Sequence, residues 1–239
     1  MATRRSNIAT FTGIFEIIRE LFSKENKVKK ANFSFNSQGA CPNCKGLGVV
    51  EFDLAFMESV TDVCEVCKGK RFSPNVLQYL YNGKDISQVL DLSVDEAISF
   101  FAKQPITVKL EQIKKVGLGY IRLGQALNTL SGGELQRLKL AISLDEYNQI
   151  YVFDEPTTGL HFSDIHTLLL VFEELINNGS TLIIIEHNLE MICNGDWIID
   201  LGPGAGEDGG KVLFEGTPQK LLSSEKSITS IYLRQYLNV

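Results

Sequence analysis

The sequence predicts an α/β fold: a mostly parallel sheet with flanking helices, together with a four-cysteine insertion and a helical subdomain. Between residues 149 and 201, short apolar runs alternate with a Leu-rich helical segment in the order strand, helix, strand. This order favours parallel strand pairing through right-handed crossovers. Upstream, four cysteines in two closely spaced pairs precede segments with helical apolar spacing. The sheet is therefore expected in the C-terminal part.

The composition is that of an ordinary globular protein. The 239 residues are 44% apolar and 22% charged, which is enough for a buried core and excludes disordered or collagen-like chains. The sequence has no apolar run of the roughly 18 residues that a membrane span needs, and its N-terminus lacks the apolar core of a secretion signal. We therefore expect a cytoplasmic protein with no membrane partner. The net charge of −6 argues against a generally basic, nucleic-acid-coating surface.

Residues 1–39 are expected to form an amphipathic helix and a basic connector. The apolar residues that share one helical face are Ile14, Ile17, Ile18, Leu21 and Phe22. Basic residues outnumber acidic ones here, and they are Arg4, Arg5, Arg19, Lys24, Lys27, Lys29 and Lys30. Such a strip suits contact with phosphates or forms an ordinary solvated face, and the sequence favours neither.

Residues 40–83 are expected to form a zinc module. Cys41-Pro-Asn-Cys44 and Cys64-Glu-Val-Cys67 are two CxxC pairs, and each such turn directs two thiolates at one point. Four thiolates leave no open coordination position, so the predicted Zn²⁺ site is structural. Redox-active pairs or buried thiols are the alternative.

The segment between the two cysteine pairs is expected to form a hairpin arm. The apolar residues that alternate along it are Val50, Phe52, Leu54 and Phe56. Lys68, Lys70 and Arg71 lie beside the second pair. They suit contact with a nucleic-acid backbone, although such modules also serve in protein contacts or are purely structural.

Residues 84–147 are expected to form a helical subdomain. Ser93 and Glu96 have the spacing of a capping box at a helix start. Leu130-Ser-Gly-Gly-Glu134 precedes another run with helical apolar spacing. Two glycines at a helix start expose backbone N–H groups at the positive end of the helix dipole, which suits an anion. A capped helix start without a ligand is the alternative.

Residues 148–239 are expected to form the α/β lobe. Gln149–Phe153 and Thr181–Ile185 are apolar runs typical of parallel strands that are buried on both faces. Residues 163–177 have the Leu-rich pattern of the helix between them, and Trp197–Leu201 is expected as a third strand. Beyond these, we expect an edge strand at Val212–Glu215 and a last helix that begins at Thr217-Pro218.

Acidic and histidine side chains follow the first two predicted strands. Asp154 and Glu155 end the first strand, and His187 follows the second. The carboxyl ends of parallel strands meet at one sheet edge, where such sheets bind ligands. Asp154 would hold Mg²⁺ through water and Glu155 would polarise an attacking water. An acidic turn without a ligand is the alternative.

Three motifs in order, LSGGE, DEPTTGLH and IIIEH, resemble those of the ABC-type ATPases. Longer stretches, such as RRSNIATFTGIFEIIRELF and DWIIDLGPGAG, resemble the C-terminal cassette of the UvrA family, the DNA-damage-sensing ATPases of bacterial excision repair. The resemblance covers nearly the whole chain. It implies an ABC-type ATPase fragment whose helical subdomain carries the signature motif.

The resemblance also implies a role for each motif. Asp154 would be the Walker B metal ligand, Glu155 the general base and His187 the switch histidine. The D-loop would run through Thr158, Gly159, Leu160 and His161. The residues implied to bind the nucleotide, whose phosphates another cassette mainly holds, are Ser131, Gly132, Gly133, Glu134, Asp154, Gly159 and His161.

The implied cofactors are ATP and Mg²⁺ beside the structural Zn²⁺. The implied partners are damaged duplex DNA, a second ATPase cassette or protomer, and a repair partner similar to UvrB. The sequence contains no GxxxxGK[ST] pattern. We therefore expect that the chain begins downstream of the family's P-loop and binds ATP together with a P-loop from outside this chain. We expect it to have little ATPase activity alone. The alternatives are a UvrA-like paralogue in antibiotic resistance and a non-catalytic, zinc-stabilised binding module.

Overall fold

The computed structural model describes residues 6–52, 60–144, 147–204 and 209–238. The chain divides into two compact units, Met1–Asp145 and Glu146–Val239, and each is described by itself. Among the described residues, no helix has both the length and the apolar composition that crossing a bilayer requires.

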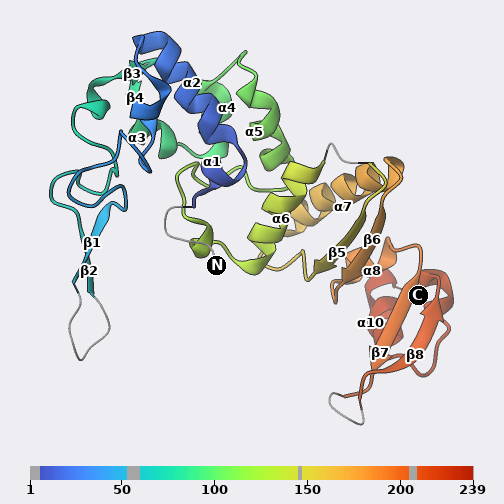
Figure 1. Ribbon diagram of the computed structural model, residues 1–239. Helices are drawn as coiled ribbons and strands as arrows, with labels where there is room; N and C mark the ends of the chain where they lie inside the picture. The colour runs from blue at the N-terminus through green and yellow to red at the C-terminus, as the bar shows by residue number, and fades with distance from the viewer. Residues whose placement is uncertain (1–5, 53–59, 145–146, 205–208, 239) are drawn as a thin grey trace. The chain divides into compact units, whose positions relative to one another are not determined.

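The first unit is mainly helical (Figure 1). Its helices are α1 (Ile8–Phe11), α2 (Ile14–Asn26), α3 (Ile86–Leu90), α4 (Val94–Phe100), α5 (Ile106–Lys115) and α6 (Gly132–Ser143), with 3-10 turns η1 (Lys30–Phe33), η2 (Val76–Gln78) and η3 (Leu127–Thr129). Its antiparallel strand pairs are β1 (Val49–Phe52) with β2 (Val60–Val63), and β3 (Leu80–Tyr81) with β4 (Lys84–Asp85).

The predicted N-terminal helix is confirmed as α2. Ile14, Ile18 and Phe22 of the predicted face are fully buried, and Phe15 beside them is buried as well. Gly13 precedes the helix with a φ of 74°, in the left-handed region that glycine adopts without steric cost. This conformation turns the chain from α1 into α2.

Aromatic rings anchor the cysteine segment to α2. The ring centroid of Phe22 lies 5.4 Å from that of Phe33, and the Phe35 centroid lies 5.1 Å from Phe15 and 5.7 Å from Phe72. Phe33 and Phe35 precede the first cysteine pair, whereas Phe72 follows the second. The core therefore fixes both ends of the segment that carries the four cysteines.

The predicted hairpin arm is confirmed in its described part. Val49 pairs with Val63, and Val50 pairs with Asp62, in the antiparallel β1–β2 register. Figure 1 shows this pair extending away from the helices of the same unit. The predicted alternation at Leu54 and Phe56 lies outside the described residues.

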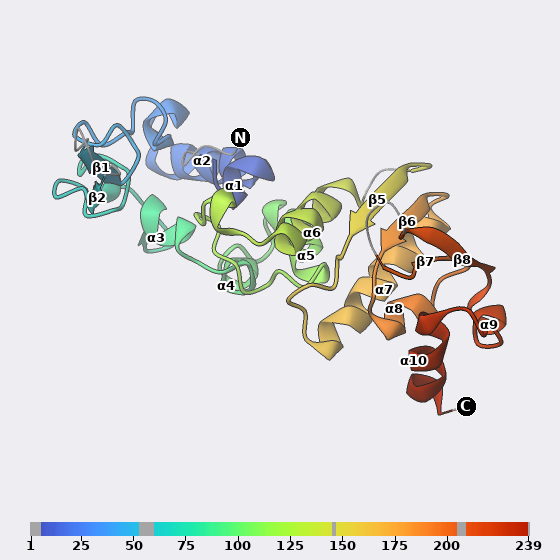
Figure 2. The same cartoon turned by 90° about the horizontal axis from the view of Figure 1, so that it is seen from below.

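The described residues of the second unit include one parallel strand pair. β5 (Ile150–Asp154) and β6 (Thr181–Ile185) are in register from Ile150 opposite Thr181 to Asp154 opposite Ile185. The connecting helix, α7 (Phe162–Asn177), lies along one face of this pair in both views (Figures 1 and 2). The Phe153 ring packs against Phe172 at a centroid distance of 4.9 Å. The predicted strand–helix–strand unit is thus confirmed.

The prediction that these two strands are buried on both faces is wrong. The face opposite α7, here called the open face, consists of Ile150, Val152, Ile183 and Ile185, which are 73%, 63%, 52% and 56% exposed. A continuous apolar run identifies a strand, because every side chain in it suits an apolar surface. It does not specify the segment that covers each face, since that segment lies elsewhere in the sequence.

Strands form where Trp197–Leu201 and Val212–Glu215 predicted them, but the prediction that the first of these joins the parallel sheet is wrong. β7 (Ile198–Gly202) pairs antiparallel with β8 (Lys211–Gly216), with Ile199 opposite Glu215, in a separate two-stranded sheet. Parallel pairing needs a crossover of about a dozen residues or more, whereas a short connection returns the chain antiparallel. Among the described residues, the mostly parallel sheet is therefore limited to β5 and β6.

Three short or terminal helices complete the second unit. They are α8 (Leu189–Cys193), α9 (Pro218–Leu221) and α10 (Ile228–Leu237). The predicted helix start at Thr217-Pro218 is confirmed, with the Thr217 side chain accepting the N–H of Lys220, but this helix is not the last one, because α10 follows it. The hydroxyl groups of Ser227 and Thr229 donate to the Asp200 carboxylate at 2.5 and 2.9 Å. These bonds fix α10 to β7.

Candidate active site and metal centre

The four cysteines of the two CxxC pairs converge on one point. The Sγ atoms of Cys41 and Cys64 are 3.9 Å apart, and those of Cys44 and Cys67 are 3.6 Å apart. All four sulfurs lie within 4.8 Å of one another, and each side chain is at most 5% exposed. The predicted four-cysteine cluster is confirmed.

Tight turns after each pair bring the sulfurs together. The residues that follow Cys44 and Cys67 are a Lys-Gly dipeptide in both cases, and all four of these residues have positive φ. A Cβ at Gly46 would lie 1.8 Å from the carbonyl oxygen of Phe35, so only glycine fits there. The Gly48 N–H donates to Cys44 Sγ at 3.2 Å, as amides do around metal thiolates.

The cluster fits a tetrahedral Zn²⁺ ion. A Zn–S distance of about 2.3 Å places tetrahedral sulfurs about 3.8 Å apart, close to both measured pairs. The Cys67 N–H and the Asn43 amide lower the pKa of the Cys64 thiol to about 6, and burial raises the pKa of the Cys67 thiol to about 12. Once all four thiols are ionised, their buried negative charge would need a cation, so Zn²⁺ would bind as the protons leave. Cys41, Cys44, Cys64 and Cys67 would hold the ion.

The signature segment forms a capped helix start. The Ser131 N–H donates to Glu134 Oε2 at 2.7 Å, and the Glu134 N–H donates to Ser131 Oγ at 3.2 Å. Ser131 and Gly132 are exposed, whereas Gly133 is buried. The first N–H groups of a helix have no intrahelical partner, so this exposed start suits an anion. A capped helix start and an anion-binding helix start were the two alternatives, and this geometry is compatible with both.

Tyr120 supports this helix start, and no sequence motif pointed to it. Its hydroxyl donates to Glu134 Oε1 at 2.5 Å. The Tyr120 side chain is 61% exposed, but partial burial of its hydroxyl group and this Glu134 contact raise the pKa of Tyr120 to about 12. Tyr120 and Ser131 thus hold opposite oxygens of one carboxylate.

In the second unit, Glu155 and His187 follow β5 and β6 and come close together. His187 Nδ1 lies 3.6 Å from Glu155 Oε1. Both side chains face a cleft of about 590 Å³, and they are 54% and 79% exposed. The cleft residues among the predicted site residues are Glu155, Thr158, Gly159, Leu160, His161 and His187.

Glu155 has a restrained local geometry. Its φ is 46°, a left-handed conformation that is uncommon for a residue with a side chain. Its N–H donates to the carbonyl oxygen of Ile185 at 2.9 Å, and Thr158 Oγ1 donates to its Oε2 at 3.4 Å. Asp154 is exposed at the end of β5 and is not among the residues that line the cleft.

Glu186 is a further site residue that the sequence did not predict. Its Oε1 accepts the N–H and the hydroxyl of Thr157 at 2.9 and 2.5 Å. Its Oε2 accepts the N–H groups of His187 and Asn188 at 2.9 and 3.1 Å. Burial raises the pKa of Glu186, but these bonds together outweigh it and lower the pKa below 4.5. A carboxylate directly before His187 was the available signal.

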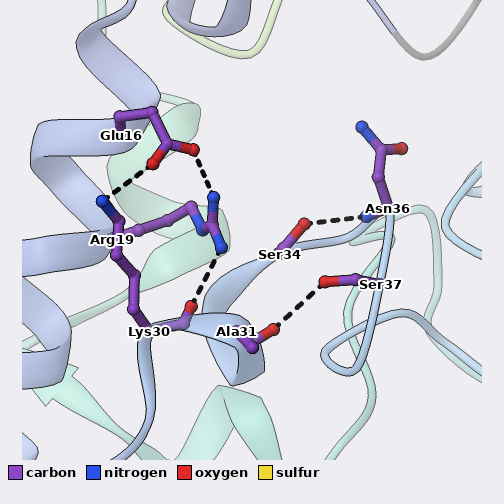
Figure 3. Close-up of polar contacts among 7 residues, drawn as sticks. All are labelled: Glu16, Arg19, Lys30, Ala31, Ser34, Asn36 and Ser37. Atoms are coloured by element: carbon purple, nitrogen blue, oxygen red, sulfur yellow. Dashed lines mark hydrogen bonds and ion pairs between the residues drawn. The ribbon is translucent and has the colours of Figure 1, made fainter.

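The basic strip of the first unit is partly neutralised by acids. Figure 3 shows the Glu16 carboxylate between Arg19 and Lys30, with Lys30 Nζ at 2.8 Å from Oε2. Arg19 also donates to the Lys30 carbonyl oxygen at 3.2 Å, and Lys24 pairs with Glu20 at 2.8 Å. Arg4 and Arg5 lie outside the described residues. Much of the described positive charge is therefore used within the chain.

The sequence model of the ABC transporter family matches residues 17–158. The chain belongs to the ABC transporter family. The match includes the LSGGE segment and the Asp154-Glu155 strand end, and Glu186 and His187 follow it. The family that the motifs indicated is confirmed.

The chain is also similar to individual proteins along nearly its whole length. It is 46% identical to UvrABC system protein A of Clostridium perfringens over 98% of this chain, and 49% identical to that of Neisseria gonorrhoeae over 99%. The crystal structure of UvrA2 from Deinococcus radiodurans is 44% identical over 98% of this chain and 30% of that one, with a TM-score of 0.88. The chain spans about a quarter (26%) of the length of the curated relatives it matches.

Proposed function

We propose that this chain supplies one side of an ATP-hydrolysing site in a DNA-repair ATPase of the UvrA type. The observation that carries the proposal is the pairing of Glu155 with His187 at 3.6 Å, at the carboxyl ends of two parallel strands. Ligands of α/β sheets bind at this edge. The similarity to UvrABC system protein A supports the repair assignment.

Each site residue has a chemical role in this proposal. Glu155 accepts a proton from the attacking water, and His187 orients the reacting groups beside it. Asp154 holds Mg²⁺ through water, which neutralises phosphate charge when the ion is bound. Ser131, Gly132, Gly133 and Glu134 form the helix start that receives the γ-phosphate of ATP bound mainly by another cassette. Gly159 and His161 belong to the loop that follows Glu155.

The remaining phosphate cradle would come from outside these 239 residues. The sequence has no GxxxxGK[ST] pattern, and that loop supplies most donors to the β- and γ-phosphates. The open face supports this view, because an apolar strand surface of this kind is normally covered in α/β proteins. A second ATPase cassette or protomer is the expected source of the cradle.

Zinc, DNA and a protein partner complete the proposal. Zn²⁺ would hold the cysteine segment folded without a catalytic role. Of the three predicted basic residues, Lys68 is exposed and suits contact with the backbone of damaged duplex DNA. Lys70 Nζ lies 3.4 Å from Asp85 Oδ2, and the half-buried Arg71 lies over the Phe35 ring. Because phosphate contacts release counterions, the affinity for duplex DNA should fall steeply with salt. A UvrB-like protein is the proposed repair partner.

The proposal is tested by restoring the missing loop. The chain is mixed with a polypeptide that carries the GxxxxGK[ST] loop of an ABC cassette, here called the P-loop partner, and phosphate release is measured. The mixture should hydrolyse ATP, the chain alone should show little turnover, and E155Q should lower turnover by about 10²-fold or more. Robust turnover by the chain alone, or an active E155Q mixture, would contradict the proposal.

A further inference from the structure

The carboxylate of Glu186 ties together two loops that are distant in sequence. Oε1 accepts both donors of Thr157, which lies 29 positions upstream, at 2.9 and 2.5 Å. Oε2 accepts the N–H groups of His187 and Asn188 in its own loop. Four donors therefore converge on one carboxylate between the loop after β5 and the loop after β6.

These two loops carry the reacting side chains. Glu155 and His187 are 54% and 79% exposed, so packing of their side chains does little to hold them. Their separation of 3.6 Å therefore depends on where the two backbones lie. The Glu155 N–H bond to the Ile185 carbonyl oxygen, 2.9 Å, links the same loops at the strand ends. Beyond the strand ends, Glu186 links the two loops through its bonds to Thr157.

The chemistry of this link requires a carboxylate. An ionised carboxylate only accepts hydrogen bonds, and bonds to it are stronger than those between neutral groups. A glutamine keeps one acceptor oxygen, but its NH₂ group would face two donors at the other position. The loss of charge therefore breaks one half of the link, although the size of the side chain is nearly unchanged.

We propose that Glu186 is a positioning residue that aligns Glu155 with His187 by clamping Thr157 to the loop after β6. The proposal rests on the proposed function of Glu155 and His187. A misalignment of about 1 Å at a reacting centre can cost about 10²-fold in rate. Loss of the clamp should thus lower kcat while substrate binding, which other groups provide, changes little.

The test compares E186Q and T157V with the matched control E190Q. Glu190 lies in the first turn of α8, directly after this loop, and bonds there through its backbone N–H and carbonyl oxygen. E190Q therefore removes a nearby carboxylate without changing the clamp. Amide hydrogen exchange of Thr157, His187 and Asn188 is measured in the full chain. Phosphate release is measured separately with the P-loop partner.

E186Q should speed exchange at these amides and lower kcat by about tenfold or more, with KM within about twofold. T157V, which removes one of the four donors, should have the same effects to a smaller extent, and E190Q should match the parent chain. Unchanged exchange in E186Q would overturn the clamp, and faster exchange with unchanged kcat would overturn its role in alignment. If the mixture has no ATPase activity, the proposed function fails, whereas the exchange data still decide whether the clamp exists.

Discussion

Tyr120 shows how one side chain stabilises the helix start that we propose to receive phosphate. Its hydroxyl and the Ser131 N–H bind opposite oxygens of Glu134. Partial burial of the hydroxyl group and the Glu134 contact raise the pKa of the phenol from 10 to about 12. The folded state therefore favours the protonated phenol, so its contribution to stability is complete below the unfolded pKa. That contribution is lost as the pH rises from about 10 through 12.

We predict that Y120F is less stable than the parent chain at pH 8 and that the difference shrinks as the pH rises from about 10 to 12. The reason is that the parent must then hold a phenolate beside the Glu134 carboxylate. Urea midpoints at several pH values measure the difference. Y232F is the control, because it removes a phenol on α10 whose exposure, 57%, is similar to the 61% of Tyr120. A difference between parent and Y120F that does not vary with pH would contradict the assignment.

Two helices of the first unit, α4 and α6, begin with the same Ser–Glu capping box. Comparing them therefore distinguishes helix capping from phosphate binding. In α4, the Ser93 N–H donates to Glu96 Oε2 at 2.8 Å, and Ser93 Oγ accepts from the Glu96 N–H at 3.2 Å. The corresponding distances at Ser131 are 2.7 and 3.2 Å. The two serines therefore make the same capping hydrogen bonds, at nearly the same distances.

S93A and S131A should each lower the free energy of unfolding by about 1 kcal/mol, because each removes one cap. In phosphate release with the P-loop partner, S131A should be slower by about tenfold or more, whereas S93A should stay near the parent rate. Denaturant unfolding and steady-state turnover of both variants are the measurements. Equal rates for the two variants would leave Ser131 as a helix cap alone.

The zinc module is the second element that can be tested by itself. We predict one Zn²⁺ per chain by elemental analysis and its loss in C64S, since a tetrahedral thiolate site does not tolerate the loss of a ligand. Amide exchange should then accelerate between Cys41 and Phe72. C193S, which alters a half-buried thiol outside the cluster, should keep the ion. Retention of full stoichiometry in C64S would contradict the site.

The features that could be predicted from the sequence are those determined by residues close together in the chain. The CxxC spacing fixes the direction of two sulfurs, and the Ser93–Glu96 spacing fixes a cap, so both were found from the sequence alone. The Glu186 clamp was missed because its donor Thr157 is brought near only by the loop geometry at the ends of β5 and β6. The pairing of β7 with β8 was missed because apolar content does not specify the direction of pairing.

At the scale of the whole molecule, the open face is the feature that local patterns could not foresee. Val152 and Ile183 are 63% and 52% exposed, although they lie on strands whose other face packs against α7. The strands that carry them end at the candidate catalytic groups. A polypeptide that covers this face therefore lies beside Glu155, as we propose for the polypeptide that carries the phosphate-binding loop.

V152T and I183T should alter the unfolding free energy of the chain by no more than about 0.5 kcal/mol, because these side chains are already in water. L175A, at a fully buried position of α7, should instead cost about 2–5 kcal/mol. Each of the two threonine variants should weaken binding of the P-loop partner by about tenfold, because about 1–2 kcal/mol of apolar burial is lost. I231T, at a residue 46% exposed on α10, is the matched surface control in titration calorimetry. Parent-like affinity of V152T and I183T, or equal weakening by I231T, would mean that the P-loop partner binds elsewhere.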